Sequence, residues 1–264
     1  MYFRGAKIFT LISKNLISQI RLLHHKKHRD EQQFFIVEGV KSCIETLQSN
    51  FEVLHSFATN RLSTSDIEFS NIQLISEKEM ERISCFSTAP EILCIVKKPP
   101  YYLSDLDNEK PLLVLDAIRD PGNLGTIIRT ADWFGFGQIL CSEDCVEFTN
   151  PKVIQATMGS FTRIKIVYAN LPEYLKTQTH KAIYGLDMNG EPIQKQTFKH
   201  NDIIIVGSES HGISETVAAH IGTKIEIPIF PHIGASPESL NAAIAAGIFM
   251  YENRRQKVDD VMIR

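Results

Sequence analysis

Three separated segments in the second half of the chain carry amide, carboxylate and small residues where an apolar strand is expected to end. They are DAIRDPGNLGTIIRTADWFG (116–135), IIIVGSESHGIS (203–214) and IPIFPHIGASPESLNAAIAAGIFMYE (227–252). Open α/β sheets bind their ligands in the crevice outside the carboxyl ends of the strands. The sequence therefore predicts one ligand site to which all three segments contribute.

The first segment predicts a turn followed by a helix. Asp120, Pro121 and Gly122 are turn residues, and Asn123 after them is placed to cap a helix that carries Arg129 nearly two turns further on. A helix N-terminus with an arginine nearby suits a phosphate. At this point an anion site and an ordinary capped helix with a surface arginine both remain open.

The second segment places a carboxylate at the end of an apolar run. Residues 203–206 are followed by Gly207, Ser208 and Glu209. A glycine there lets a ligand approach the backbone closely, and a glutamate at the mouth of a buried strand needs a partner, for which Arg129 is the natural candidate. The alternative is a tight turn in which Glu209 is solvated and Ser214 caps the next helix.

The third segment ends a strand in Ile227-Pro228-Ile229 and, after a loop, opens an alanine-rich helix with Ser239, Leu240 and Asn241. Proline inside a parallel strand is unfavourable because it removes a donor from the hydrogen-bond ladder. The small residues of the helix predict close packing against another backbone or another subunit. A plain serine cap on a packed helix is the simpler alternative.

Around these segments, strands and helices alternate from about residue 105 onward, which predicts a mostly parallel sheet with helices on both faces. The expected strands are PLLVLDAI, QILCS, RIKIVYA, AIYGLDM, IIIVGSE and KIEIPI, and the expected helices are 123–135, 150–160, 171–178, 214–221 and 239–256.

Residues 1–104 predict a separate small α/β domain, and the polar, proline-bearing stretch 97–111 indicates a linker. Its expected helices are 8–23, GVKSCIETLQS and SEKEMERIS, and its expected strands are FFIVEG, FEVLHSFAT, IQLIS and ILCIVKKP. Ser76 with Glu79 fits a capping box. Residues 1–29 hold seven Lys and Arg and no acid. We therefore predict contacts to RNA phosphates from Arg21, Lys26, Lys27 and Arg29, with a solvated helix end as the alternative.

Composition narrows the class further. The net charge of −3, with 43% apolar residues, is ordinary for a folded soluble protein, and no apolar run is long enough to span a membrane. Five cysteines, an odd number, favour a reduced, cytoplasmic setting. Cys141 and Cys145 are closely spaced, but no second pair matches them, so we expect no metal. No G-x-G-x-x-G follows a strand, which argues against a dinucleotide-binding dehydrogenase.

Taken together, the three segments and NPKVIQATMGSFTRIKI (150–166) resemble the SpoU (TrmH-like) RNA 2'-O-ribose methyltransferases of the SPOUT superfamily over residues 111–256. More weakly, RLLHHKKHRDEQQFFIVEGVKSCIE resembles the RNA substrate-binding domain of many members, which has a ribosomal-protein-like fold. The resemblance implies an α/β protein with an RNA-binding domain at 1–104 and a trefoil-knotted, parallel-sheet methyltransferase domain at 105–264.

The resemblance also implies S-adenosylmethionine (SAM) as methyl donor, a tRNA or rRNA substrate, and a homodimer formed through the knotted domain, for which the alanine-rich 241–247 stretch is suited. Residues that match the family's functional positions fall into two groups. Those at cofactor-binding positions are Gly207, Ile227, Ile229 and Leu240, and those at catalytic positions are Asn123, Arg129, Glu209, Ser239 and Asn241.

The chemistry expected of these residues is activation of a poor nucleophile. A ribose 2'-hydroxyl must lose its proton, and Arg129, itself almost always protonated, would lower the pKa of the hydroxyl electrostatically. Asn123 and Asn241 would orient Arg129 or the ribose, Ser239 would hydrogen-bond within the site, and Glu209 would pair with Arg129.

One feature departs from the family pattern: the loop 230–238 is longer than the usual link, which affects the expected positions of Ser239 and Ile229. His232 within it is expected to be an exposed loop residue. Two other functions remain as alternatives. One is a non-catalytic RNA-binding or assembly factor on a methyltransferase scaffold, and the other is an RNA base methyltransferase.

Overall fold

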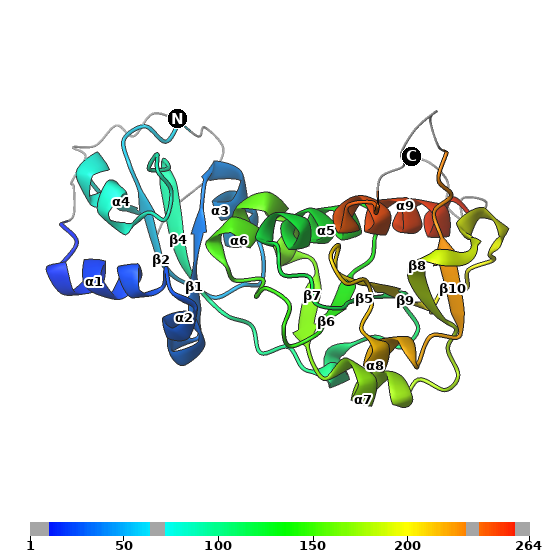
Figure 1. Cartoon of the computed structure of the whole chain (residues 1–264). Coiled ribbons are helices and arrows are strands. Elements are labelled where there is room, and N and C mark those ends of the chain that lie inside the picture. The colour runs from blue at the N-terminus through cyan, green and yellow to red at the C-terminus, as the bar shows by residue number, and fades with distance from the viewer. Residues whose placement is uncertain (1–10, 64–71, 231–237, 257–264) are drawn as a thin grey trace. The chain divides into compact units, whose positions relative to one another are not determined.

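A computed structural model of the chain describes residues 11–63, 72–230 and 238–256 (Figure 1). The chain divides into two compact units, and the division is not at a single point of the sequence. The first unit runs to Pro100 and also includes Glu147–Thr162, and the second comprises Tyr101–Val146 and the chain from Arg163 onward. His232 lies outside the described residues.

The first unit is built on a four-stranded sheet. Its strands are β1 (Phe34–Glu38), β2 (Val53–Ala58), β3 (Gln73–Leu74) and β4 (Ile92–Lys97), in the order β1-β4-β2-β3. Strand β4 is antiparallel to both of its neighbours, and β3 is parallel to β2. The helices before residue 100 are α1 (Lys14–Leu22), α2 (Lys26–Gln32), α3 (Val40–Leu47) and α4 (Glu77–Ile83).

The elements expected in this unit are present, with one addition, but the first helix is shorter than the expected 8–23. It begins at Lys14, residues 11–13 are not helical, and residues 8–10 lie outside the described part of the chain. The capping box of α4 is present, since Ser76 accepts from the backbone N–H of Glu79 and the Glu79 carboxylate accepts from that of Ser76. The basic stretch forms a further short helix, α2, which ends at Gln33 in the left-handed region with φ 58°. The sequence of this helix contains no apolar residues at helical spacing, so the pattern of the sequence does not predict it.

Residues 147–162 form α6 (Pro151–Thr157) and a 3₁₀ turn, η2 (Ser160–Thr162), and belong to the first unit. Phe148 meets Phe35, and Phe161 meets both Phe35 and Phe51, edge to face with ring centroids 5.5–6.0 Å apart. Such aromatic pairs prefer this geometry because the positive ring edge meets the negative face. A segment from the middle of the second predicted domain is thus held in the core of the first unit.

The second unit contains a six-stranded sheet in which every pair of neighbours is parallel. In the order β10-β8-β9-β5-β6-β7, its strands are β10 (Thr223–Glu226), β8 (Ile183–Pro192), β9 (Ile203–Val206), β5 (Leu112–Leu115), β6 (Gln138–Cys141) and β7 (Lys165–Tyr168). All residues of β5, β6 and β9 are buried, as expected for central strands covered on both faces.

Helices cover both faces of this sheet, which confirms the expected layering. Figure 1 shows α5 (Pro121–Trp133) and α9 (Ala242–Arg255) on one face, and α7 (Leu171–Lys176) and α8 (Glu215–Ala218) on the other. The 3₁₀ turns η1 (Leu103–Asp105) and η3 (Ile193–Lys195) lie in connections. None of the helices in the described part of the chain is long and apolar enough to cross a membrane.

The register of the parallel strands brings four strand ends level with one another. Leu115 at the end of β5 pairs with Cys141 of β6 and Val206 of β9, and Cys141 pairs with Tyr168 of β7. The residues that follow these strands therefore emerge along one edge of the sheet. At the other end of the order, β10 ends at Glu226, so Pro228 lies beyond the strand and removes no ladder donor, contrary to the expected strand KIEIPI.

Candidate active site

The carboxylate of Glu209 brings together three of the five predicted catalytic residues. Its Oε1 accepts hydrogen bonds from Asn123 Nδ2 at 2.9 Å, from Asn241 Nδ2, and from the backbone N–H of Ala242 at 3.1 Å. Asn241 Nδ2 also donates to Asn123 Oδ1 at 2.9 Å. The start of α5, the turn after β9 and the start of α9 therefore meet at one carboxylate oxygen, and we call Asn123, Glu209, Asn241 and Ala242 the Glu209 cluster.

The helix starts fix how these amides face. Asn241 caps α9, because its Oδ1 accepts from the backbone N–H groups of Ala243 at 3.0 Å and Ile244 at 3.2 Å. With the amide oxygen engaged in the cap, the amide nitrogen must face Glu209. A carboxylate at the N-terminus of a helix is also stabilised by the helix dipole. The cap and the cluster therefore support each other.

Two expectations for α5 are corrected. Asp120, not Asn123, caps the helix, since Asp120 Oδ1 accepts from the Asn123 N–H at 2.8 Å. This frees the Asn123 side chain for Glu209. The expected Glu209–Arg129 pair is also absent from the described part of the chain. Because six helical residues turn through about 600°, Arg129 is rotated about 120° from Asn123 around α5, and it lies exposed outside the Glu209 cluster.

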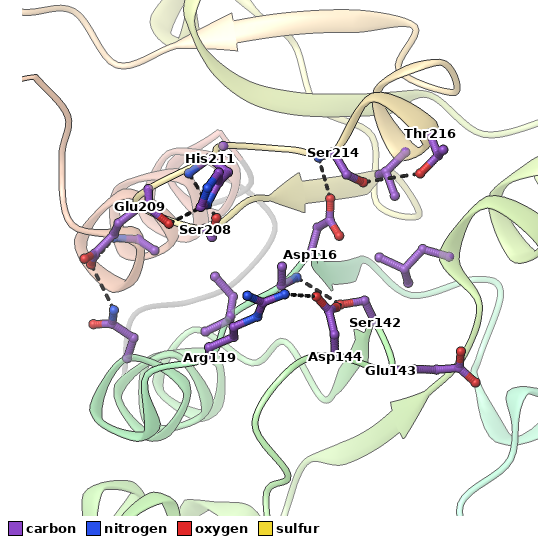
Figure 2. A pocket seen from close by; sticks show the side chains of 18 of the residues that line it. Asp116, Arg119, Ser142, Glu143, Asp144, Ser208, Glu209, His211, Ser214 and Thr216 are labelled. Atoms are coloured by element: carbon purple, nitrogen blue, oxygen red, sulfur yellow. Dashed lines mark hydrogen bonds and ion pairs between the residues drawn. The ribbon is translucent and has the colours of Figure 1, made fainter.

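A cavity of about 720 Å³ opens beside the cluster at the carboxyl ends of β5, β6, β7 and β9 (Figure 2). Asn123 and Glu209 line it, and so do polar residues that the sequence reasoning did not select. These further polar residues are Asp116, Arg119, Asp120, Ser142, Glu143, Asp144, Asn170, Ser208, Ser210, His211, Ser214 and Thr216. Each of the four strands is followed at once by some of them, and that position in the sequence is the signal by which they could have been found.

Hydrogen bonds hold the wall of this cavity in place. Arg119 donates to Asp144 Oδ2 at 2.8 Å, and the Ser142 hydroxyl donates to Asp144 Oδ1 at 2.6 Å. The Ser142 hydroxyl, and then Arg119, hold the pKa of the Asp144 carboxyl below its usual value. Ala117 adopts φ 56°, an unusual backbone for a residue with a side chain, and its N–H donates to Ser142 Oγ at 2.9 Å.

The four predicted cofactor-binding residues do not line this cavity. Gly207 is required by the turn that follows β9: a Cβ there would lie 2.2 Å from the backbone of Gly212. Ile229, after β10, and Leu240, before α9, keep 52% and 44% of their surfaces exposed. Ile227 is half-buried, and Ser239 is exposed outside the Glu209 cluster. Within the described residues, no group of three or more His, Cys, Asp or Glu gathers to hold a metal ion.

The predicted RNA contacts divide into exposed and buried residues. Arg21, Lys26 and Lys27 are exposed, but Arg29 is only 2% exposed. Its guanidinium donates to the carbonyl oxygens of residues 23 and 24 at 2.8 and 2.9 Å and forms an ion pair with the buried Glu147. The prediction that Arg29 contacts RNA is therefore corrected: it ties α2 to the segment 147–162 within the first unit.

Comparison with known proteins gives a family match over both predicted domains. Residues 110–251 match the model of the SpoU rRNA Methylase family, and residues 14–94 match that of the MRM3-like substrate binding domain. A curated relative, the 23S rRNA (guanosine(2553)-2'-O)-methyltransferase RlmP of Bacillus subtilis, is 31% identical, with 88% of this chain and 93% of the relative aligned.

Solved structures agree with the sequence comparison. A putative RNA methyltransferase of the TrmH family from Porphyromonas gingivalis is 31% identical, with a TM-score of 0.83 over 94% of this chain and all of that one. The AdoMet-bound rRNA methyltransferase from Sinorhizobium meliloti is 27% identical, with a TM-score of 0.81 over 94% and 97% of the two chains. The chain therefore belongs to the SpoU rRNA methylase family.

Proposed function

We propose that this protein catalyses the SAM-dependent methylation of a ribose 2'-hydroxyl in large-subunit ribosomal RNA. The Glu209 cluster carries the proposal, because it joins the three chemistry-bearing segments in one place. The relative from Bacillus subtilis is named for this reaction on 23S rRNA, and residues 14–94 match a substrate-binding domain model. These names favour rRNA over tRNA as the substrate. We also propose that the protein is located in the cytoplasm.

SAM supplies a methyl group activated for transfer when it is bound. The residues that would hold it are Gly207, Ile227, Ile229 and Leu240. Their fit rests on the exposed apolar side chains of Ile229 and Leu240, which suit the flat face of an adenine ring. The trefoil knot of this family is part of the proposal. It is supported by the match of residues 110–251 to the family model.

The protein's own contribution is to position and polarise the 2'-hydroxyl. In our proposal the amides of Asn123 and Asn241, oriented by Glu209, hydrogen-bond to the ribose, and Ser239 borders the site. The guanidinium of Arg129 lowers the pKa of the hydroxyl by its charge, because a positive group stabilises the alkoxide that forms. The proton then passes to solvent or to a phosphate oxygen of the substrate.

We further propose that the protein is a homodimer through the α5–α9 face. Ile244, Ile248 and Tyr251 form an exposed apolar stripe on α9, and Trp133 on α5 is 84% exposed. Contiguous apolar surface of this kind is typical of interfaces. In the alanine-rich stretch 241–247, which is expected at the interface, Ala242, Ala243 and Ala246 are buried in their own chain and Ile244 is exposed.

Arg129 lies one helical turn before Trp133 on α5, and both side chains are exposed. Residues four apart lie on the same side of a helix. An arginine on this side is available to the active site of a partner subunit as well as to its own. This explains how it can take part in catalysis while lying outside the Glu209 cluster of its own chain.

The methylation proposal is tested with labelled SAM, unmodified 23S rRNA and tRNA, and digestion of the product to nucleosides. We expect label in a 2'-O-methyl nucleoside from 23S rRNA. Arg129→Ala should slow transfer by roughly 10²–10³-fold, the usual effect of removing one electrostatic stabiliser of the transition state, while Arg82→Ala, an exposed arginine of the first unit, should not. Label in a methylated base, or no transfer to either RNA, would contradict the proposal.

The RNA-binding role of the first unit is tested by comparing substitutions of its exposed basic side chains with a substitution of the buried Arg29. Lys26→Glu with Lys27→Glu should weaken RNA binding and lower the slope of log affinity against log salt by roughly one to two, because two phosphate contacts are lost. Arg29→Met should instead lower the free energy of unfolding by about 3–5 kcal/mol, because it leaves Glu147 buried without its partner. Unchanged affinity and salt slope in the lysine variant would contradict the assignment.

The interface is tested by light scattering of the intact protein. We expect a mass twice that of the 29.9 kDa chain. Ile244→Glu with Ile248→Glu should shift the protein to the monomer, because two charges would be buried in an apolar interface. Leu54→Glu, which changes an exposed apolar residue of the first unit, is the matched control. A monomeric wild type, or a dimer unaffected by both α9 changes, would refute this interface.

A further inference from the structure

The cavity beside the Glu209 cluster extends well beyond the residues used in the proposed reaction. Of its polar lining, only Asn123 and Glu209 belong to the cluster. Its volume of about 720 Å³ falls within the range of about 300–1,000 Å³ of small-molecule sites. A nucleobase is well within this size. Because Asn123 and Glu209 are themselves part of the lining, the cavity and the cluster are continuous.

The cavity holds a buried carboxylate with unused hydrogen-bonding capacity. Asp116, the residue after β5, is 4% exposed. Its Oδ2 accepts from the Ser214 N–H at 2.7 Å, and among the described residues this is the one hydrogen bond to the carboxylate. A carboxylate can accept about four hydrogen bonds, and burying it is costly unless they are made. Asp116 is thus suited to a ligand that presents N–H donors.

Arg119 supplies hydrogen-bond donors to the same cavity, which suit an acceptor on a ligand. Figure 2 shows the Arg119 side chain reaching toward Asp144 from the turn after β5. A guanidinium has five N–H donors in a planar fork, and one ion pair leaves several of them available. The lining of the cavity therefore includes both a carboxylate acceptor, Asp116, and guanidinium donors, those of Arg119.

Among the four RNA bases, guanine matches this arrangement. It alone has donors on two adjacent atoms of its Watson–Crick edge, N1–H and the N2 amino group, and its O6 acceptor lies beside them. Uracil has a single N3–H between two acceptors, and adenine and cytosine each have an acceptor next to their amino group. RNA-binding proteins read splayed-out bases through such edges, and enzymes that flip a base out hold it in a pocket.

We propose that this cavity is the base-recognition site for the target nucleotide and selects guanine, with Asp116 accepting from N1–H and N2–H and Arg119 donating to O6. The inference rests on the proposed function, because it assigns the base attached to the ribose that is methylated. It gives the cavity a role in choosing the nucleotide, separate from the chemistry at the Glu209 cluster.

The test measures the binding of GMP, inosine monophosphate (IMP) and AMP to the full-length protein by calorimetric titration. IMP is guanosine monophosphate without the N2 amino group, so it loses one hydrogen bond to Asp116. We expect GMP to bind roughly tenfold more tightly than IMP, since a difference of about 1.4 kcal/mol is tenfold, and AMP to bind more weakly still. Asp116→Asn should abolish the preference for GMP over IMP, because its amide oxygen would accept from the Ser214 N–H, which leaves the amide NH2 facing the N–H groups of guanine.

The matched control is Glu143→Gln. Glu143 lies in the turn after β6, and its substitution by Gln removes one negative charge, as Asp116→Asn does. Figure 2 shows the Glu143 side chain pointing away from Asp116 and Arg119, so the preference for GMP over IMP should persist. An unchanged melting temperature and SAM affinity would show that Asp116→Asn is folded. If that variant does not fold, the comparison of GMP with IMP in the wild type decides.

Equal affinity of the wild type for GMP and IMP, no binding of either, or a preference retained in Asp116→Asn would overturn the inference. The methyl-transfer assay separates this failure from that of the proposed function. Label in 2'-O-methyladenosine, 2'-O-methylcytidine or 2'-O-methyluridine would overturn guanine selection and leave ribose methylation standing. Absence of any 2'-O-methyl product would instead remove the function on which the inference rests.

Discussion

The site depends on one carboxylate oxygen that accepts three N–H donors from two helix starts. Glu209 Oε1 accepts hydrogen bonds from the side-chain amides of Asn123 and Asn241 and from the backbone N–H of Ala242. Asn123 and Asn241 are 118 residues apart in the chain, so this oxygen links segments that no local interaction could bring together. Because the acceptor is charged, its hydrogen bonds are stronger than neutral ones. The Glu209 side chain is exposed to solvent, however, so we attribute to the cluster a role in positioning more than in stability.

The parallel sheet makes this meeting possible. Its buried strands end level with one another, so the turns after β5, β6, β7 and β9 all open on one edge. Apolar runs and strand–helix alternation specify such a sheet, and the sequence predicted it correctly together with the layering of helices. It also predicted that Asn123, Glu209 and Asn241 belong to one site, because each follows the end of a strand or opens a helix beside one.

Other features depend on side-chain partners that a sequence does not reveal. Glu209 lies near two amides and not Arg129, because helical rotation takes Arg129 away from Asn123. Arg29 looks like its exposed basic neighbours in sequence, yet it is buried against Glu147, a residue 118 positions away. The segment around Phe148 and Phe161 reads as part of the second domain but packs in the first unit. The first outcome follows from the local geometry of the helix, whereas the other two are set by long-range packing, which periodicity and residue type do not encode.

The most direct test of this account is the rate of methyl transfer to 23S rRNA by Glu209→Ala. The change removes the acceptor common to the three donors while leaving the sheet and both helix caps in place. We predict that the rate falls at least about 100-fold, the scale of misplaced catalytic groups, and that the free energy of unfolding changes by about 1 kcal/mol or less, as for other exposed charged groups. Transfer at the wild-type rate would contradict the claim that Glu209 assembles the active site.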